Sequence, residues 1–160
     1  MEIFAPLAEG RHPRRYQAGQ VIYLQDSPAD EFYYLVRGTA RSYISSRSGG
    51  ERILSIHRAG DLMGEASFFD ECPRVSSAVT VTECEIVSVD RAALDRVFRQ
   101  HPELALPMLQ YLARTVRMLS HYVDEATFLP AGARLGRHLL SGAREGVPFP
   151  CTHEELGFAI

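Results

Sequence analysis

Residues 64 to 74, with the sequence GEASFFDECPR, combine a glycine, a carboxylate, small side chains and an arginine in one short segment. Gly64 allows a ligand to approach the backbone closely, and Glu65 can accept a hydrogen bond from a ribose hydroxyl. Exposed backbone N–H groups favour anions, and the Arg74 guanidinium can bind a phosphate through two parallel hydrogen bonds. The segment therefore predicts a site for a small anion. Its candidate residues are Gly64, Glu65, Ala66, Ser67, Arg74 and Val75.

A second interpretation of the same segment remains open. Glu65 and Arg74 could pair with each other or with neighbouring groups and have no ligand. In that case the segment would be an ordinary surface turn.

The elements that must position this segment are β-strands. Glycines divide the first hundred residues into short apolar or alternating runs, which is typical of strands separated by turns. Ser48-Gly49-Gly50 predicts a hairpin turn. Because no helical pattern lies between consecutive strands, a closed roll or sandwich is favoured over an open parallel sheet. The predicted strands are residues 21–24, 32–36, 40–44, 53–56, 77–81 and 85–89.

Helices follow Asp90, which is a suitable N-cap. A short helix is predicted over residues 91–99 and a much longer one over residues 103–128, where Pro107 kinks the helix or delays its start. Apolar residues of the long helix recur at steps of three and four and form one stripe with a/d spacing. The stripe consists of Leu109, Leu112, Val116, Leu119, Val123 and Ala126.

Polar residues, among them Arg114, Arg117 and Ser120, flank this stripe. We therefore favour dimerisation through the long helix; the alternative is that the stripe packs on the β-structure of the same chain. After a break at residues 129–132, an amphipathic helix is expected around Leu135, Leu139 and Leu140. A final helix is expected to start at a capping box formed by Thr152 and Glu155.

The order of these pieces resembles that of the Crp/Fnr family of bacterial transcription regulators. Residues 52–63 and 79–87, on either side of the anion-binding segment, are similar to the cyclic-nucleotide-binding β-roll of that family. Residues 152–160 are similar to the first helix of a winged helix-turn-helix. The resemblance extends from about Tyr16 to Ile160.

This resemblance implies an α+β fold. It consists of an antiparallel β-roll, which is a jelly-roll-like double-stranded β-helix, then a long dimerisation helix and the start of a winged helix-turn-helix. The corresponding divisions are residues 1–101 for the roll with flanking short helices, 102–129 for the helix, and 130–160 for an incomplete DNA-binding domain without its recognition helix.

The function implied is the effector-sensing and dimerisation portion of a transcription regulator. A small ligand in the roll, wedged against the long helix, would shift a population of dimer conformations and hence alter DNA binding. Leu119 and Ser120 are the expected transmission points and further ligand-binding residues. The implied partners are a second copy of the chain, a small-molecule effector, and DNA only through the missing downstream helix. We expect residues 1–160 to bind operator DNA weakly or not at all.

Two positions depart from members that respond to cyclic AMP. In those members Ser or Thr follows the phosphate-binding arginine, whereas here Val75 does. Two adjacent hydroxyl residues of the long helix meet the purine in those members, whereas here Leu119 precedes Ser120. Each hydrogen-bonding group left unpaired costs on the order of 1 to 3 kcal/mol. Two interpretations follow: either the effector is not cyclic AMP, or the pocket is vestigial and another small anion or apolar acid binds nearby. Arg74 and Glu65 could still hold a cyclic dinucleotide, a phosphorylated metabolite or an aromatic acid.

Other functional classes find little support in the composition. The net charge of −3 argues against a nucleic-acid clamp, and the basic run at residues 11–15 does not change this. Cys72, Cys84 and Cys151 form no CxxC pair, and the histidines lack the His-x-His spacing of a cupin-like metalloenzyme. No catalytic nucleophile has a base beside it. We expect no enzyme activity, no metal and no certain cofactor, although a cyclic nucleotide or another small anionic effector is possible.

The expected location is the cytoplasm, without a membrane partner, because no apolar run reaches the roughly 18 residues of a membrane span. Two alternative functions remain open. One is a cyclic-nucleotide-binding regulatory module of a non-transcriptional protein, such as a kinase or a channel. The other is a β-roll with a vestigial pocket that serves as a dimerisation scaffold.

Overall fold

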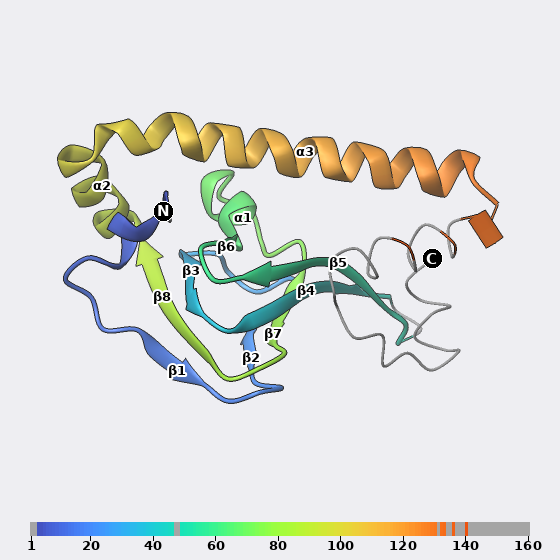
Figure 1. Cartoon of the computed structure of the whole chain (residues 1–160), viewed down its shortest axis with the longest axis horizontal. Helices are drawn as coiled ribbons and strands as arrows, with labels where there is room; N and C mark the ends of the chain where they lie inside the picture. The colour runs from blue at the N-terminus through green and yellow to red at the C-terminus, as the bar shows by residue number, and fades with distance from the viewer. Residues whose placement is uncertain (1–2, 47–48, 131, 134–135, 137–139, 141–160) are drawn as a thin grey trace. The chain divides into compact units, whose positions relative to one another are not determined.

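The computed structural model describes residues 3–46, 49–130, 132–133, 136 and 140. The chain divides into two compact units, residues 1–109 and 110–160, which are described separately below. The first unit contains two four-stranded sheets, and every strand pair in them is antiparallel (Figure 1). The predicted antiparallel β-roll is therefore confirmed. One sheet has the order β1 (Arg14–Tyr16), β8 (Cys84–Asp90), β3 (Glu31–Arg37), β6 (Leu62–Met63), and the other has the order β2 (Val21–Tyr23), β7 (Ser77–Thr80), β4 (Thr39–Ser45), β5 (Glu51–Arg58).

The predicted hairpin joins β4 to β5. Ser45 is opposite Glu51 in the register, and the Gly49 N–H donates to the Ser46 carbonyl oxygen at 3.0 Å. Gly49 has a φ of +88°, a backbone conformation that glycine adopts without strain. The turn therefore forms where the sequence places its glycines.

Strand β3 is buried on both faces. Tyr33 and Leu35 belong to the core cluster inside the roll, together with residues such as Ile86. The Phe32 side chain points to the opposite face of the strand. Its ring centroid lies 5.0 Å from that of Phe68, which belongs to the short helix α1 (Glu65–Phe69). Burial on both sides explains why residues 32–35 form an uninterrupted apolar and aromatic run.

The two helices predicted over residues 91–99 and 103–128 are present, with small changes at their ends. Helix α2 (Arg91–Gln100) begins after Asp90, whose side chain accepts a hydrogen bond from the Ala93 N–H at 2.7 Å, as expected of an N-cap. The long helix α3 (Ala105–Phe128) begins after the short 3-10 turn η2 (Pro102–Leu104). Pro107 lies in the first turn of α3, where a missing N–H costs no helical hydrogen bond.

Three elements were absent from the sequence-based prediction: strands β1 and β6 and helix α1. A further 3-10 turn, η1 (Ala5–Ala8), precedes the first strand. Most of the predicted helix around residues 135–140 and all of the predicted final helix at residues 152–160 lie outside the described residues. No helix in the described part of the chain is long and apolar enough to cross a membrane.

Candidate ligand-binding site

The segment from Gly64 to Arg74, called the cassette below, consists of Gly64, helix α1 and a loop that returns to Arg74. Gly64 has a φ of +73°, in the region that disfavours other residues. A Cβ atom at this position would lie 2.3 Å from Nη1 of Arg74 and 3.2 Å from the ring of Tyr23. The absence of a Cβ atom at Gly64 therefore makes room for the Arg74 guanidinium.

Arg74 is folded into the roll, with only 2% of its surface exposed. Its Nη1 donates to the Gly64 carbonyl oxygen at 2.7 Å, and its Nη2 donates to the carbonyl oxygen of Glu31. Its Cζ lies 4.5 Å from the ring centroid of Tyr23 and 5.5 Å from that of Tyr33, within the range of cation–π attraction. Two backbone carbonyls and two aromatic rings thus hold the guanidinium, and these hydrogen bonds do not involve the Glu65 carboxylate.

One nitrogen of this guanidinium, Nε, has no hydrogen-bond partner among the described residues. Among the side chains that the structure describes, Nε of Arg74 is the buried nitrogen or oxygen atom without a hydrogen-bond partner. Such an atom costs about 1 to 3 kcal/mol and is rare in folded proteins, so it marks a place where a partner is missing.

The Glu65 carboxylate is also buried in the cassette. Burial raises the pKa of Glu65 above its usual value, although the positive charge of Arg74 acts in the opposite direction. A raised pKa means that folding is more favourable when this carboxyl is protonated. Its contribution to stability is therefore present at low pH and is lost as the pH rises through the folded-state pKa.

The raised pKa of Glu65 leads to a prediction for the variant Glu65→Gln. The variant is expected to be more stable than the wild type at pH 7, because it removes a buried charge, and the difference is expected to shrink as the pH falls toward 4.5, the usual value. Urea unfolding at several pH values measures the effect. Glu51→Gln, which changes a carboxylate on the exposed end of β5, is the control. A Glu65→Gln variant less stable than the wild type at pH 7 would contradict the assignment.

The small residues of the cassette have different environments. Ser67 is buried, and its Oγ accepts a hydrogen bond from the Val75 N–H at 3.2 Å, which ties the end of the cassette to α1. Ala66 is exposed, and Val75 has 61% of its surface exposed. Of these residues, Ser67 has a structural role, whereas Ala66 and Val75 are accessible to a ligand.

Two tyrosines and one glutamate complete the surroundings of Arg74, and the sequence analysis did not identify them. Burial raises the pKa of Tyr23 to about 12, so its hydroxyl stays neutral. The Tyr33 hydroxyl donates to Oε1 of Glu31 at 2.7 Å, and burial raises the pKa of Tyr33 as well. No motif joins these residues to the cassette, because Tyr23 and Tyr33 lie on strands of different sheets and meet only where the two sheets pack, with their ring centroids 5.6 Å apart.

The roll also has an open cavity of about 370 Å³. Three carboxylate residues, Asp30, Glu31 and Asp90, line it, and Arg74 is the one cassette residue among its lining. Such a concentration of negative charge disfavours an anion. The cavity therefore does not have the chemistry that the cassette predicts.

The remaining predicted site residues belong to the second unit, on α3. The Ser120 Oγ donates to the carbonyl oxygen of Val116 at 3.0 Å, within the helix, and Leu119 is exposed. The structure thus brings the six candidate residues from 64 to 75 together in the first unit, and Leu119 and Ser120 lie in the other unit.

The chain is similar to known proteins in sequence and in fold. The profile of the cyclic nucleotide-binding domain matches residues 13–101. The chain is 31% identical over 155 residues to the "CRP-like cAMP-activated global transcriptional regulator" of Mycobacterium tuberculosis, and the match covers 94% of this chain and 69% of that protein. The chain belongs to the Crp/Fnr family of transcription regulators. It thus comprises a cyclic nucleotide-binding domain of this family followed by a long helix.

Other Crp/Fnr proteins agree with this assignment. The chain is 26% identical over 155 residues to the "cAMP-activated global transcriptional regulator CRP" of Salmonella typhimurium, with 91% of this chain and 74% of that protein covered. The structure of the Thermus thermophilus catabolite activator protein superimposes with a TM-score of 0.66 at 30% identity, covering 95% of this chain and 78% of that one. These relatives are transcription regulators and not enzymes, as the sequence analysis expected.

A further solved structure supports the fold alone. It is the c-di-GMP-responsive global regulator CLP of Xanthomonas campestris, with a TM-score of 0.81 at 20% identity, covering 98% of this chain and 83% of that chain.

Proposed function

We propose that the cassette of this Crp/Fnr chain binds a cyclic nucleotide, and that the cyclic phosphate accepts a hydrogen bond from Nε of Arg74. The unpartnered, buried Nε atom is the observation that carries this proposal. A phosphate oxygen would supply the missing acceptor in a charge-assisted hydrogen bond. Glu65, one residue after Gly64, would accept a hydrogen bond from the ribose.

Ligand binding at this atom must involve movement. Nε is shielded from solvent, because the guanidinium is held by the Gly64 and Glu31 carbonyls and by the two tyrosine rings. A phosphate can reach it only if the cassette rearranges around Arg74. Binding would therefore favour one arrangement of the cassette over another, which is the requirement for a ligand to shift a conformational equilibrium.

Cyclic AMP is the first ligand to consider, since the Mycobacterium tuberculosis and Salmonella typhimurium relatives are described as cAMP-activated. Val75 offers no hydroxyl beside the arginine, and the loss of one such hydrogen bond weakens binding by about 1 to 3 kcal/mol. We infer that the cassette binds cyclic AMP more weakly than a site with Ser or Thr at this position, and that another cyclic nucleotide is the alternative ligand.

The test of this proposal is thermal unfolding of the 160-residue chain with and without cyclic AMP, with cyclic GMP as the second candidate. A ligand at one hundred times its Kd stabilises the folded state by about 2.7 kcal/mol, which raises the unfolding temperature. Adenosine, which lacks the phosphate, is the control. An equal shift with adenosine, or no shift with either cyclic nucleotide at millimolar concentration, would contradict the proposal.

A second part of the proposal concerns α3. Val116 and Val123 have 64% and 66% of their surfaces exposed, Leu109 is similarly exposed, and these residues share the a/d stripe. The Ala126 side chain lies outside the described residues. We propose that a second copy of the chain covers the stripe in a parallel dimer, since burial of an apolar stripe against its own copy is the basis of coiled-coil pairing. Ligand binding in the roll would then alter this dimer and the DNA-binding residues that follow α3.

The substitution Val116→Glu tests the dimer. It would place a charge in the apolar seam twice per dimer, so we expect the dimer Kd to rise by about 100-fold or more. Sedimentation equilibrium measures the change. Gln110→Glu adds the same charge at an exposed polar position of α3 and is expected to leave the dimer Kd nearly unchanged. Equal effects of the two substitutions would contradict dimerisation through the stripe.

A further inference from the structure

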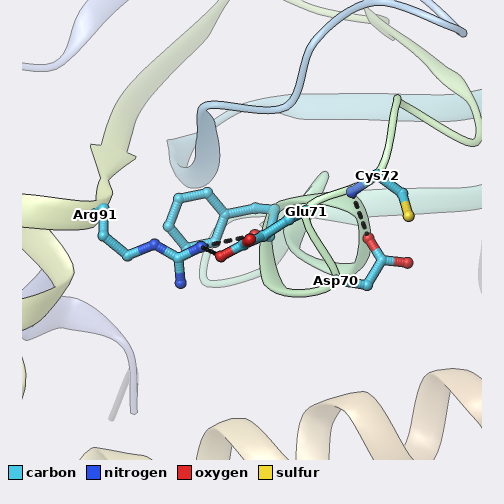
Figure 2. Close-up of polar contacts among 5 residues, drawn as sticks. Asp70, Glu71, Cys72 and Arg91 are labelled. Atoms are coloured by element: carbon cyan, nitrogen blue, oxygen red, sulfur yellow. Dashed lines mark hydrogen bonds and ion pairs between the residues drawn. The ribbon is translucent and has the colours of Figure 1, made fainter.

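Arg91, the first residue of α2, reaches the far end of the cassette helix (Figure 2). Its Nη2 lies 2.8 Å from Oε1 of Glu71 and donates to the Phe68 carbonyl oxygen at 3.4 Å. Its Cζ lies 4.7 Å from the centroid of the Phe68 ring. One guanidinium therefore contacts a helix-terminal carbonyl, an aromatic face and a carboxylate of the same short segment.

The hydrogen bonds within this segment join residues close together in sequence. Helix α1 has only five residues, so its last carbonyl groups lack partners within the helix. Glu71 has a φ of +58°, which is uncommon for a residue other than glycine. The N–H of the next residue, Cys72, donates to the Asp70 carboxylate at 3.1 Å (Figure 2) and to the Ser67 carbonyl oxygen at 3.2 Å, so short-range hydrogen bonds close the loop. Arg91 supplies the contact between this loop and α2.

The energy of the ion pair itself is small. The Arg91 and Glu71 side chains are 51% and 76% exposed, and exposed ion pairs contribute little to global stability. The arrangement matters for another reason: a planar guanidinium can bond a carbonyl and a carboxylate while it packs on a ring, which an ammonium group cannot reproduce. The contact is therefore suited to fixing a local geometry.

We propose that Arg91 is a positioning residue of the cassette, which holds the end of α1 and couples its movement to the start of α2. Insofar as a ligand causes that movement, the inference rests on the proposed function. In the chain, helix α2 is followed by η2 and then by the long helix α3. Arg91 therefore links the candidate ligand site to α2, the helix that precedes η2 and α3 in the sequence.

Hydrogen exchange of the 160-residue chain tests this coupling, in the absence and presence of cyclic AMP. For Arg91→Gln we expect amide exchange in residues 65–72 to become about tenfold faster, with an unfolding temperature close to that of the control. Arg15→Gln is the matched control, because Arg15 forms another exposed pair, with Glu85 at 3.4 Å, on β1. Arg91→Lys should restore only part of the protection.

The ligand arm uses cyclic AMP as the probe. In the wild type we expect cyclic AMP to slow exchange in the cassette and at the start of α2. In Arg91→Gln, cyclic AMP should slow exchange in the cassette alone, and the Kd for cyclic AMP should rise about tenfold. If cyclic AMP protects nothing in the wild type while Arg91→Gln still opens residues 65–72, the proposed function fails and the positioning role stands. If Arg91→Gln exchanges like Arg15→Gln in residues 65–72, the positioning role is wrong, whatever cyclic AMP does.

Discussion

Arg74→Ala is expected to lower the free energy of unfolding by about 3 to 5 kcal/mol, because it removes two charge-assisted hydrogen bonds to backbone carbonyls, worth about 1.5 to 3 kcal/mol each, and also creates a cavity. Those carbonyls belong to Gly64 and Glu31. The Tyr23 and Tyr33 rings would also lose their cation–π contacts with the Arg74 guanidinium. Urea unfolding measures the loss.

The matched control is Arg41→Ala. Arg41 also lies over a tyrosine ring, with its Cζ 5.3 Å from the centroid of Tyr43, but its side chain is partly exposed and its partner Glu51 lies at 3.5 Å. Removal of such an exposed pair costs about 1 kcal/mol or less. If Arg74→Ala destabilises the chain no more than Arg41→Ala, the buried arrangement of Arg74 is wrong. Because Arg74→Ala also destabilises the fold, loss of ligand binding in this variant would not by itself prove a phosphate contact.

Gly64→Ala is expected to destabilise the chain by about 2 to 5 kcal/mol, through two separate effects. The backbone φ of +73° costs roughly 1 to 2 kcal/mol for alanine, and displacement of a packed neighbour costs about 1 to 3 kcal/mol more. The new Cβ would lie 2.3 Å from Nη1 of Arg74, so the buried guanidinium would have to shift and its hydrogen bond to the Gly64 carbonyl would be disturbed. We also expect the variant to lose ligand binding, because Arg74 must shift.

Gly19→Ala separates the two effects. Gly19 has a φ of +77°, close to that of Gly64, but a Cβ at this position meets no atom within 4 Å. Urea unfolding of both variants should give the backbone cost alone for Gly19→Ala and a clearly larger loss for Gly64→Ala. Equal losses would show that Arg74 does not occupy the space beside Gly64.

The sequence predicted most of the roll because its strands follow local patterns. Strands β3, β4, β5 and β8 have seven or eight residues and are bounded by turn residues, so their periodicity is visible. Strand β1 has three residues, two of them arginines, and pairs with β8, so a local pattern does not reveal it. Helix α1 is too short for a helical period to appear.

The candidate site was predicted only in part. Gly64, Glu65 and Arg74 were identified from their types and spacing, since they lie in one segment. The environment of Arg74 was not, because Glu31, which accepts from its Nη2, is 43 positions away in sequence. A lone arginine is usually solvated, and here the packing of the two sheets, one carrying Tyr23 and the other Tyr33, forms a buried place for it.

The role of Nε of Arg74 as a phosphate donor is tested most directly by the Nε–H resonance of this residue in a proton–nitrogen NMR spectrum of the 160-residue chain, assigned with Arg74→Lys. We predict that cyclic AMP moves this resonance strongly to lower field, since a buried, unpartnered N–H gains a charged acceptor, and that adenosine does not. An unchanged resonance at saturating cyclic AMP would contradict this role of Nε.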